Sequence, residues 1–186
     1  TEGNVFFVVE VVRVLIEEAG QPDNIGRITL PQQVFAGGIQ QVIQHRLEQV
    51  INPASHELLK LAATFGRYID MHVMTAFTEQ VGITLEAWCS ECANATVLEL
   101  YDGVWRFTHD KIRDYILSQL NTDEIAYYSR QVAEIADSLY SDDPSWGETL
   151  MNLWHDAGDT DRELRYMAML VSNLAKFIGD YHRVRQ

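Results

Sequence analysis

A single hairpin pattern within an otherwise helical sequence constrains the fold of this chain most. Residues 96–108 read TVLELYDGVWRFT, in which two short runs rich in aliphatic and aromatic residues flank the pair Asp102-Gly103. An Asp-Gly pair between two such runs favours a tight two-residue turn, because both turn positions take a positive φ that Asp and Gly tolerate. We therefore expect a β-hairpin here, with helical segments on both sides.

Three helical patterns precede the hairpin. An apolar helix is expected from Ser55 to about Gly66, and shorter helices are expected over residues 70–82 and 84–95. Three short helices followed by a hairpin is the element order of a winged-helix domain. The sequence therefore predicts a winged-helix domain over residues 51–120.

The N-terminal part, residues 1–50, is also predicted to be helical. Residues 4–20 show a first helix, and a turn-rich connector with a short extended piece at 27–30 follows it. Helical spacing of apolar residues returns over residues 32–50, although Gly37-Gly38 weakens the start of that helix.

Residues 121–186 predict only helices. One amphipathic helix covers residues 123–141, and two more flank a turn at 157–159. A second turn is expected at Gly179-Asp180, before a further helix begins. Paired helices with such turns are typical of tetratricopeptide-like repeats. The expected fold class is therefore mainly α, with a helical N-terminal domain, a winged helix and TPR-like helical hairpins.

The charge balance excludes several classes of partner. Of 186 residues, 47% are hydrophobic, 14 are basic and 27 are acidic, which gives a formal net charge of -13. A surface this negative repels nucleic acids and anionic membranes, whose affinity for proteins comes largely from cationic contacts. No apolar run approaches the roughly 20 residues of a transmembrane helix, and two cysteines are too few for a disulfide scaffold. We expect a cytoplasmic chain, and its start without methionine indicates a piece of a longer protein.

Familiar catalytic motifs are missing from the sequence. It contains no G-x-x-x-x-G-K-[ST] phosphate loop, no G-x-G-x-x-G, no H-E-x-x-H and no G-x-S-x-G. Cys89 and Cys92 form one C-x-x-C pair, which lacks the further ligands of a zinc site. Their helical spacing beside Trp88 favours burial in the core over metal or redox chemistry. We expect no enzymatic activity and no metal site in this chain.

The third helix of the predicted winged helix bears on DNA binding. A helix that enters the major groove carries Arg or Lys toward bases and phosphates. Residues 84–95, TLEAWCSECANA, contain neither, and they include Glu86 and Glu91. This composition favours a protein-interaction or regulatory module over a DNA-binding transcription regulator, which is kept as an alternative.

The helix after the hairpin raises a question about one histidine. If a helix begins at Thr108, which can cap the first turn, then Ile112 and Ile116 fall on one face. Asp110 suits the positive end of the helix dipole. A histidine beside it tends to stay neutral and to offer one N–H donor where anions bind readily. His109 is therefore a candidate to fill a corner of the fold, to ligate a metal or to contact a phosphate.

Four segments, in matching chain order, resemble the STAND class of signalling NTPases. Residues 107–117, FTHDKIRDYIL, are similar to the M-H-D motif in the winged-helix domain of that class. Residues 1–13, TEGNVFFVVEVVR, are similar to the G-N-P-F-F segment of its helical lid. Residues 39–69 resemble the lid-to-winged-helix junction of bacterial members, which are often fused to transcription-regulator or nucleotide-cyclase modules. Residues 153–170 are similar to the start of their helical sensor repeats.

The resemblance implies a nucleotide-sensing role for particular residues. The lid and the winged helix would close over ADP bound to a core domain that is absent from this chain. His109 would contact the β-phosphate, and Asp110 would steady the first turn of its helix. The lid motif corresponds to Gly3, Asn4 and Val5, where valine replaces the family's proline; apolar contact with adenine is kept, but the fixed φ is lost.

The implied function is that of a switch in signal transduction. Residues 1–50 would be the lid, 51–120 the winged helix and 121–186 a linker with the start of the repeats. The whole protein would be an ATPase that binds ATP or ADP with Mg²⁺. Its partners would be its own nucleotide-binding core domain and a protein or small-molecule inducer that reaches the repeats, without direct contact to DNA or membranes. Beside DNA binding, a second alternative is a helical-repeat scaffold in which His109 is only structural.

Overall fold

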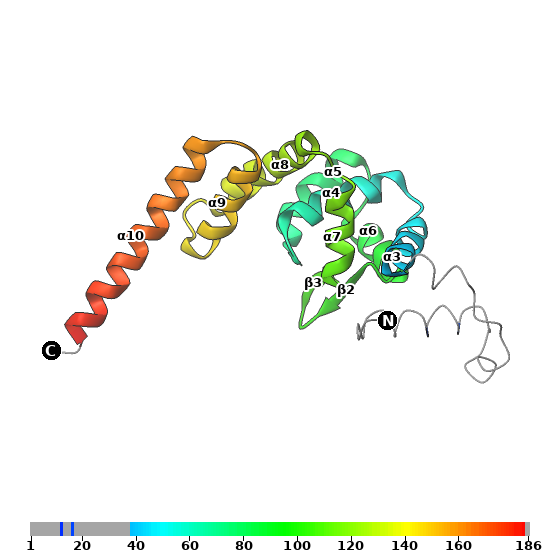
Figure 1. Cartoon of the computed structure of the whole chain (residues 1–186), viewed down its shortest axis with the longest axis horizontal. Coiled ribbons are helices and arrows are strands. Elements are labelled where there is room, and N and C mark those ends of the chain that lie inside the picture. The colour runs from blue at the N-terminus through cyan, green and yellow to red at the C-terminus, as the bar shows by residue number, and fades with distance from the viewer. Residues whose placement is uncertain (1–11, 13–15, 17–37, 185–186) are drawn as a thin grey trace. The chain divides into compact units, whose positions relative to one another are not determined.

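The computed structural model describes Val12, Ile16 and residues 38–184 of the chain (Figure 1). By the clustering of its contacts the chain divides into two compact units, Thr1–Ile51 and Asn52–Gln186.

The first unit contains helix α3, Gly38–Glu48. This is the described part of the helix expected over residues 32–50. The helix expected at 4–20 is described only at Val12 and Ile16, which are both helical. The extended piece expected at 27–30 lies outside the described residues.

The second unit is mainly helical and carries a small antiparallel sheet of three strands. Its elements are, in chain order, α4 (Pro53–Phe65), β1 (Tyr68–Ile69), α5 (Met71–Val81), α6 (Leu85–Asn94), β2 (Leu98–Tyr101), β3 (Val104–Phe107), α7 (Asp110–Ser118), α8 (Thr122–Tyr140), the 3₁₀ turn η2 (Pro144–Trp146), α9 (Gly147–Asp156) and α10 (Thr160–Val184). Within the described part of the chain, none of the helices combines the length and the apolar character needed to cross a membrane.

Helix α4 begins earlier than the sequence pattern predicted. Its cap is Asn52, whose side chain accepts the backbone N–H of Ala54 at 3.0 Å, and Pro53 takes the first helical position. Proline suits that position because its φ is already helical and its missing N–H would have no partner there. The prediction that Ser55 opens the helix is therefore wrong, whereas its end at Gly66 is confirmed.

The hairpin and its turn are confirmed, and a third strand joins them. Asp102 and Gly103 have φ values of 49° and 80°, as a turn of this kind requires. Strand β1, which the sequence analysis did not anticipate, pairs with β3, so that the strand order is β1-β3-β2. Tyr68 of β1 lies opposite Arg106 of β3.

Helix α4 forms the centre of the second unit and packs against α5, α6, α7, α8 and α9. Leu58, Leu59 and Ala62 are almost completely buried on it. Two tyrosines of α8 reach carboxylates across the core: Tyr128 donates to Glu57 at 2.7 Å, and Tyr140 donates to Asp70 at 3.2 Å.

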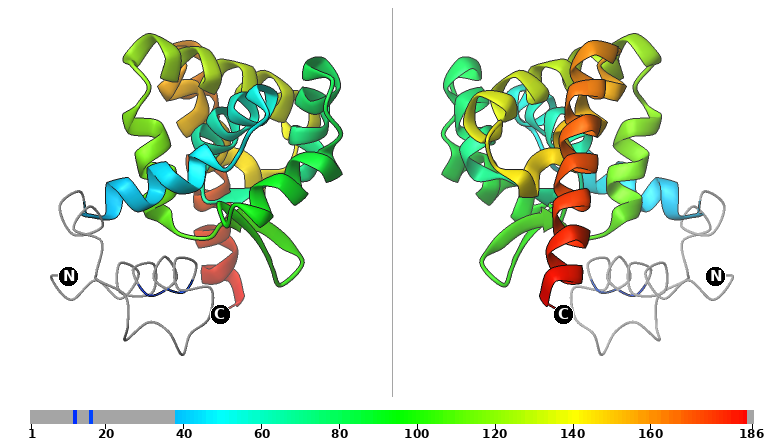
Figure 2. Two further views of the ribbon diagram at one scale, coloured as in Figure 1. Left: turned by 90° about the vertical axis from the view of Figure 1, so that its right-hand side faces the viewer. Right: turned by 90° about the vertical axis from the view of Figure 1, so that its left-hand side faces the viewer.

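Helices α8, α9 and α10 pack against one another in sequence order. The turn predicted at Gly179-Asp180 is wrong, because α10 continues through it to Val184, as Figure 2 shows in orange and red. A glycine inside a helix costs only about 0.5–1 kcal/mol relative to alanine, and here no proline follows to end the helix. The prediction of a turn at 157–159 is confirmed between α9 and α10.

Candidate functional site

His109 is the N-cap of helix α7. Its backbone is extended, with φ −151° and ψ 142°, and its Nδ1 accepts the backbone N–H of Lys111 at 3.1 Å. The carbonyl of His109 accepts the N–H of Ile112 at 3.0 Å, which closes the first turn. The histidine therefore performs the role that Ser, Thr, Asp or Asn usually performs at a helix start.

The prediction that Thr108 caps this helix is wrong. Its hydroxyl donates to the carbonyl of Thr96 at 2.8 Å, and its backbone N–H donates to the carbonyl of Val97 at 3.1 Å. Thr108 thus ties the end of the hairpin to its beginning. Because its side chain is used there, the next residue is left to cap α7.

The capping bond fixes which nitrogen of His109 carries the proton. An atom that accepts an N–H cannot itself be protonated, so in this geometry the ring is neutral with its proton on Nε2. The side chain is half-buried.

Asp110 and Arg67 form an ion pair beside His109. The Nη1 of Arg67 lies 3.0 Å from Oδ2 of Asp110, and the two side chains are 40% and 53% exposed. A pair this exposed contributes about 1 kcal/mol or less to stability. The Nε of Arg67, in contrast, is buried and makes no hydrogen bond among the described residues. A buried guanidinium N–H without an acceptor is unusual.

Helix α7 is held firmly on the core. Ile112 and Ile116 are buried, and Nε of Arg113 donates to the carbonyl of Ala63 in α4 at 2.8 Å. The first turn also carries Lys111, whose Nζ lies 3.3 Å from Asp114. The start of α7 therefore combines a helix dipole and a histidine with basic groups, Arg67 and Lys111, that are each paired with a carboxylate.

Arg67 was missed by the sequence analysis, and the sequence offers no signal for it. It lies 43 residues before Asp110, in a strand-sized segment too short to show periodicity. Of the residues predicted for nucleotide sensing, the structure places His109 and Asp110 together at the start of α7. Gly3, Asn4 and Val5 lie outside the described residues.

Cys89 and Cys92 lie inside helix α6 and are 5% and 0% exposed, which confirms the prediction that they belong to the core. Burial raises the pKa of Cys89 to about 11 and raises that of Cys92 further still. At neutral pH both are therefore protonated thiols and poor nucleophiles or metal ligands. The part of the chain that the structure describes contains no group of three or more His, Cys, Asp and Glu side chains able to hold a metal ion.

Helix α6 is tied to the start of α4 through its acidic side chain. Glu91 accepts the N–H of Asn52 at 2.9 Å and the hydroxyl of Ser55 at 2.5 Å, and Trp88 donates to the carbonyl of Ser55 at 3.3 Å. The other carboxylate of the helix, Glu86, is exposed. Helix α6 therefore presents no basic side chain that would bind a DNA phosphate or the edge of a guanine base.

Comparison of the chain with protein-family models, with curated proteins and with solved structures found no match.

Proposed function

We propose that this chain is the lid, winged-helix and sensor-linker part of an ATP/ADP-dependent STAND signalling switch. It would close over a nucleotide held by a core domain outside this chain, with His109 as the contact to the β-phosphate. The observation that carries the proposal is the position of His109 as the cap of α7, where its Nδ1 accepts the N–H of Lys111, with the Arg67–Asp110 ion pair beside it.

The order of elements supports the winged-helix part of the proposal. Helices α4, α5 and α6 precede the β2–β3 hairpin, and the short strand β1 completes a three-stranded sheet. Helix α7 then leads away from the hairpin into α8, α9 and α10, which we interpret as the linker and the first TPR-like hairpin.

The start of α7 has the donors that a phosphate requires. The Nε2–H of His109 would donate to a phosphate oxygen, and the helix dipole would favour the negative charge. Asp110 already holds Nη1 of Arg67, so the first turn carries little net charge before a ligand arrives.

The remaining nucleotide contacts would come from other parts of the protein. Gly3, Asn4 and Val5 would approach the adenine, and the phosphate loop and Mg²⁺ ligands would belong to the core domain. Hydrogen bonds to charged groups contribute roughly 1.5–3 kcal/mol each, whereas micromolar affinity requires about 8 kcal/mol. Residues 1–186 alone should therefore bind ADP only weakly.

The proposal is tested by measuring ADP release from the core domain. Labelled ADP should dissociate more slowly from the core when residues 1–186 are attached than from the core alone. Equal dissociation rates would show that this chain does not close over the nucleotide.

A helical-repeat scaffold is a second candidate, and one observation favours it. Four apolar residues of α10 with side chains 42–63% exposed recur at alternating spacings of three and four: Leu164, Met167, Val171 and Leu174. Such spacing is typical of a helix seam that packs against another helix. A partner that binds this face equally well with and without nucleotide would favour the scaffold. A DNA-binding regulator is the weakest alternative, since α6 has no basic residue.

A further inference from the structure

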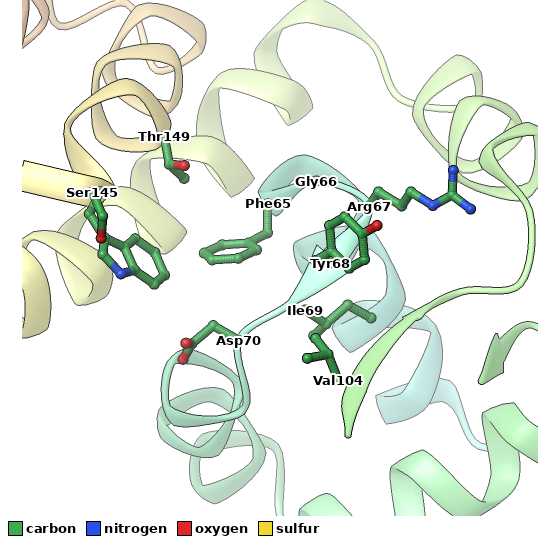
Figure 3. Close-up of a pocket in the computed structure, with 10 residues that line it drawn as sticks. Phe65, Gly66, Arg67, Tyr68, Ile69, Asp70, Val104, Ser145 and Thr149 are labelled. Atoms are coloured by element: carbon green, nitrogen blue, oxygen red, sulfur yellow. The ribbon is translucent and has the colours of Figure 1, made fainter. Parts of the chain in front are cut away.

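A cavity of about 380 Å³ opens on the second unit (Figure 3). Its walls come from the end of α4 and the segment that follows it, from the start of β3 and from the junction of η2 with α9. Phe65 and Asp70 contribute from the first of these, Val104 from the second, and Trp146 and Thr149 from the third.

Aromatic rings form much of this cavity. Tyr140 stacks on the indole of Trp146 with ring centroids 3.9 Å apart and an angle of 11°. Phe65 lies 5.6 Å from the same indole but is tilted by 56°, so these two rings diverge instead of stacking. Tyr68 also lines the cavity, and it is 56% exposed (Figure 3). The cavity therefore presents aromatic surface to solvent.

One carboxylate is held in place at this aromatic surface. Asp70 accepts the N–H of Val73 at 3.0 Å, and both of its oxygens lie 3.2 Å from the hydroxyl of Tyr140. A carboxylate has about four acceptor positions, so these bonds leave capacity on Oδ2. Arg67 lines the cavity too, but its guanidinium is directed away from these rings, to Asp110 (Figure 3).

We propose that this cavity binds an organic cation, an alkylammonium or alkylguanidinium group. The charge would lie against Asp70, and the apolar stem would lie on Phe65 and Trp146. Aromatic faces carry negative electrostatic potential and attract such cations within about 6 Å of the ring. An anion would instead meet Asp70 and a chain of net charge -13, and a neutral apolar molecule would make no use of the carboxylate.

The test is a titration of the whole chain followed by the indole N–H signal of Trp146 in nitrogen-15 NMR spectra. The probes are n-butylguanidinium and n-butylammonium, with n-butanol and butyrate as neutral and anionic counterparts of similar size. Both cations should give saturable shifts of this signal, and their affinities should exceed those of n-butanol and butyrate at least about tenfold. Equal affinities for all four, or shifts that do not saturate, would overturn the proposal.

Asp70→Asn isolates the charge, because asparagine is an equally good helix cap and keeps an acceptor for Tyr140. This variant should bind both cations about tenfold more weakly and n-butanol unchanged. Asp123→Asn is the matched control, since Asp123 is exposed in the first turn of α8 and does not line the cavity, so its replacement should leave cation affinity unchanged. If Asp70→Asn lowers the thermal stability, Tyr68→Leu is used in its place. Tyr68 lines the cavity and is exposed, so this substitution should lower cation affinity severalfold while the chain stays fully folded. Unchanged cation affinity in a folded Asp70→Asn or Tyr68→Leu variant would contradict the proposal.

The same cation could come from a small molecule or from a Lys or Arg side chain of another protein. The pentapeptide Gly-Gly-Arg-Gly-Gly distinguishes the two sources. Tighter binding of the peptide than of n-butylguanidinium identifies a protein side chain as the ligand, and tighter binding of the free cation identifies a small molecule. Binding of neither would show that the cavity is not a cation site.

Discussion

The Nδ1 atom of His109 accepts the backbone N–H of Lys111 at 3.1 Å, so the imidazole caps helix α7 through one of its two ring nitrogens. The two ring nitrogens have separate roles in this arrangement. Nδ1 contributes to the stability of the fold, whereas Nε2–H is the donor that we assign to a phosphate. Substitutions that preserve one role and remove the other can therefore separate structure from function.

His109→Ala removes the cap and should lower the free energy of unfolding of the chain by about 1 kcal/mol, within the usual range for a lost N-cap. His109→Asn should retain the wild-type stability, because asparagine is a preferred cap residue. Urea unfolding measures both. A loss of several kcal/mol in both variants would show that the ring is needed for core packing instead.

The raised pKa of Tyr166 predicts that the folded chain loses stability at alkaline pH. Burial and a hydrogen bond to Asp137 raise the pKa of Tyr166 from 10.0 to about 12. The unfolded chain therefore loses this proton first as the pH rises, so the contribution to folding is complete below pH 10 and is lost between pH 10 and 12.

Comparison with Tyr166→Phe across this pH range measures the effect. The stability difference between the wild type and the variant should shrink as the pH rises. Tyr127→Phe is the control for the loss of a tyrosine hydroxyl, because Tyr127 is 61% exposed. A difference for Tyr166→Phe that does not change with pH would contradict the raised pKa.

Cys89 and Cys92 should react slowly with thiol reagents in the folded chain. Both are buried, and burial raises the pKa of each thiol, so little thiolate is present at neutral pH. Rates of labelling with a thiol-specific reagent should rise steeply when urea unfolds the chain. Native rates equal to those of the unfolded chain would revive a redox or metal role for the C-x-x-C pair.

Duplex DNA should bind no better than at the weak non-specific level. Helix α6 has no basic residue, and the net charge of the chain is -13. A gel-shift titration at about 150 mM salt tests this expectation, with a sub-micromolar affinity as the result that would restore the DNA-binding alternative.

Local sequence signals predicted most elements of the second unit. Thr84 caps α6, Gly82 ends α5 in a left-handed conformation, and Asp102-Gly103 forms the hairpin turn. Each of these signals depends only on residues a few positions away, so it can be recognised in the sequence. Strand β1 could not be found in this way, because two residues show no alternation and its pairing partner Arg106 is far away in the sequence.

The candidate site was predictable only in part, for a related reason. The sequence identified His109 and Asp110 at a helix start. Which residue caps the helix, however, depends on whether the side chain of Thr108 bonds to the helix or to the hairpin. The hydroxyl of Thr108 bonds to Thr96 across the hairpin, and that contact depends on tertiary structure. The pairing of Arg67 with Asp110 likewise arises from the packing of α4 against α7.

ADP dissociation from this chain joined to the nucleotide-binding core that we propose for the whole protein tests the central claim most directly. His109→Asn keeps the cap but lacks Nε2–H, so it should release ADP about 10- to 100-fold faster than the wild type, as expected for one lost hydrogen bond to a charged group. His155→Ala, which changes an exposed histidine beside Glu163, should release ADP at the wild-type rate. An unchanged rate for a fully folded His109→Asn protein would contradict the assignment of His109 as the phosphate contact.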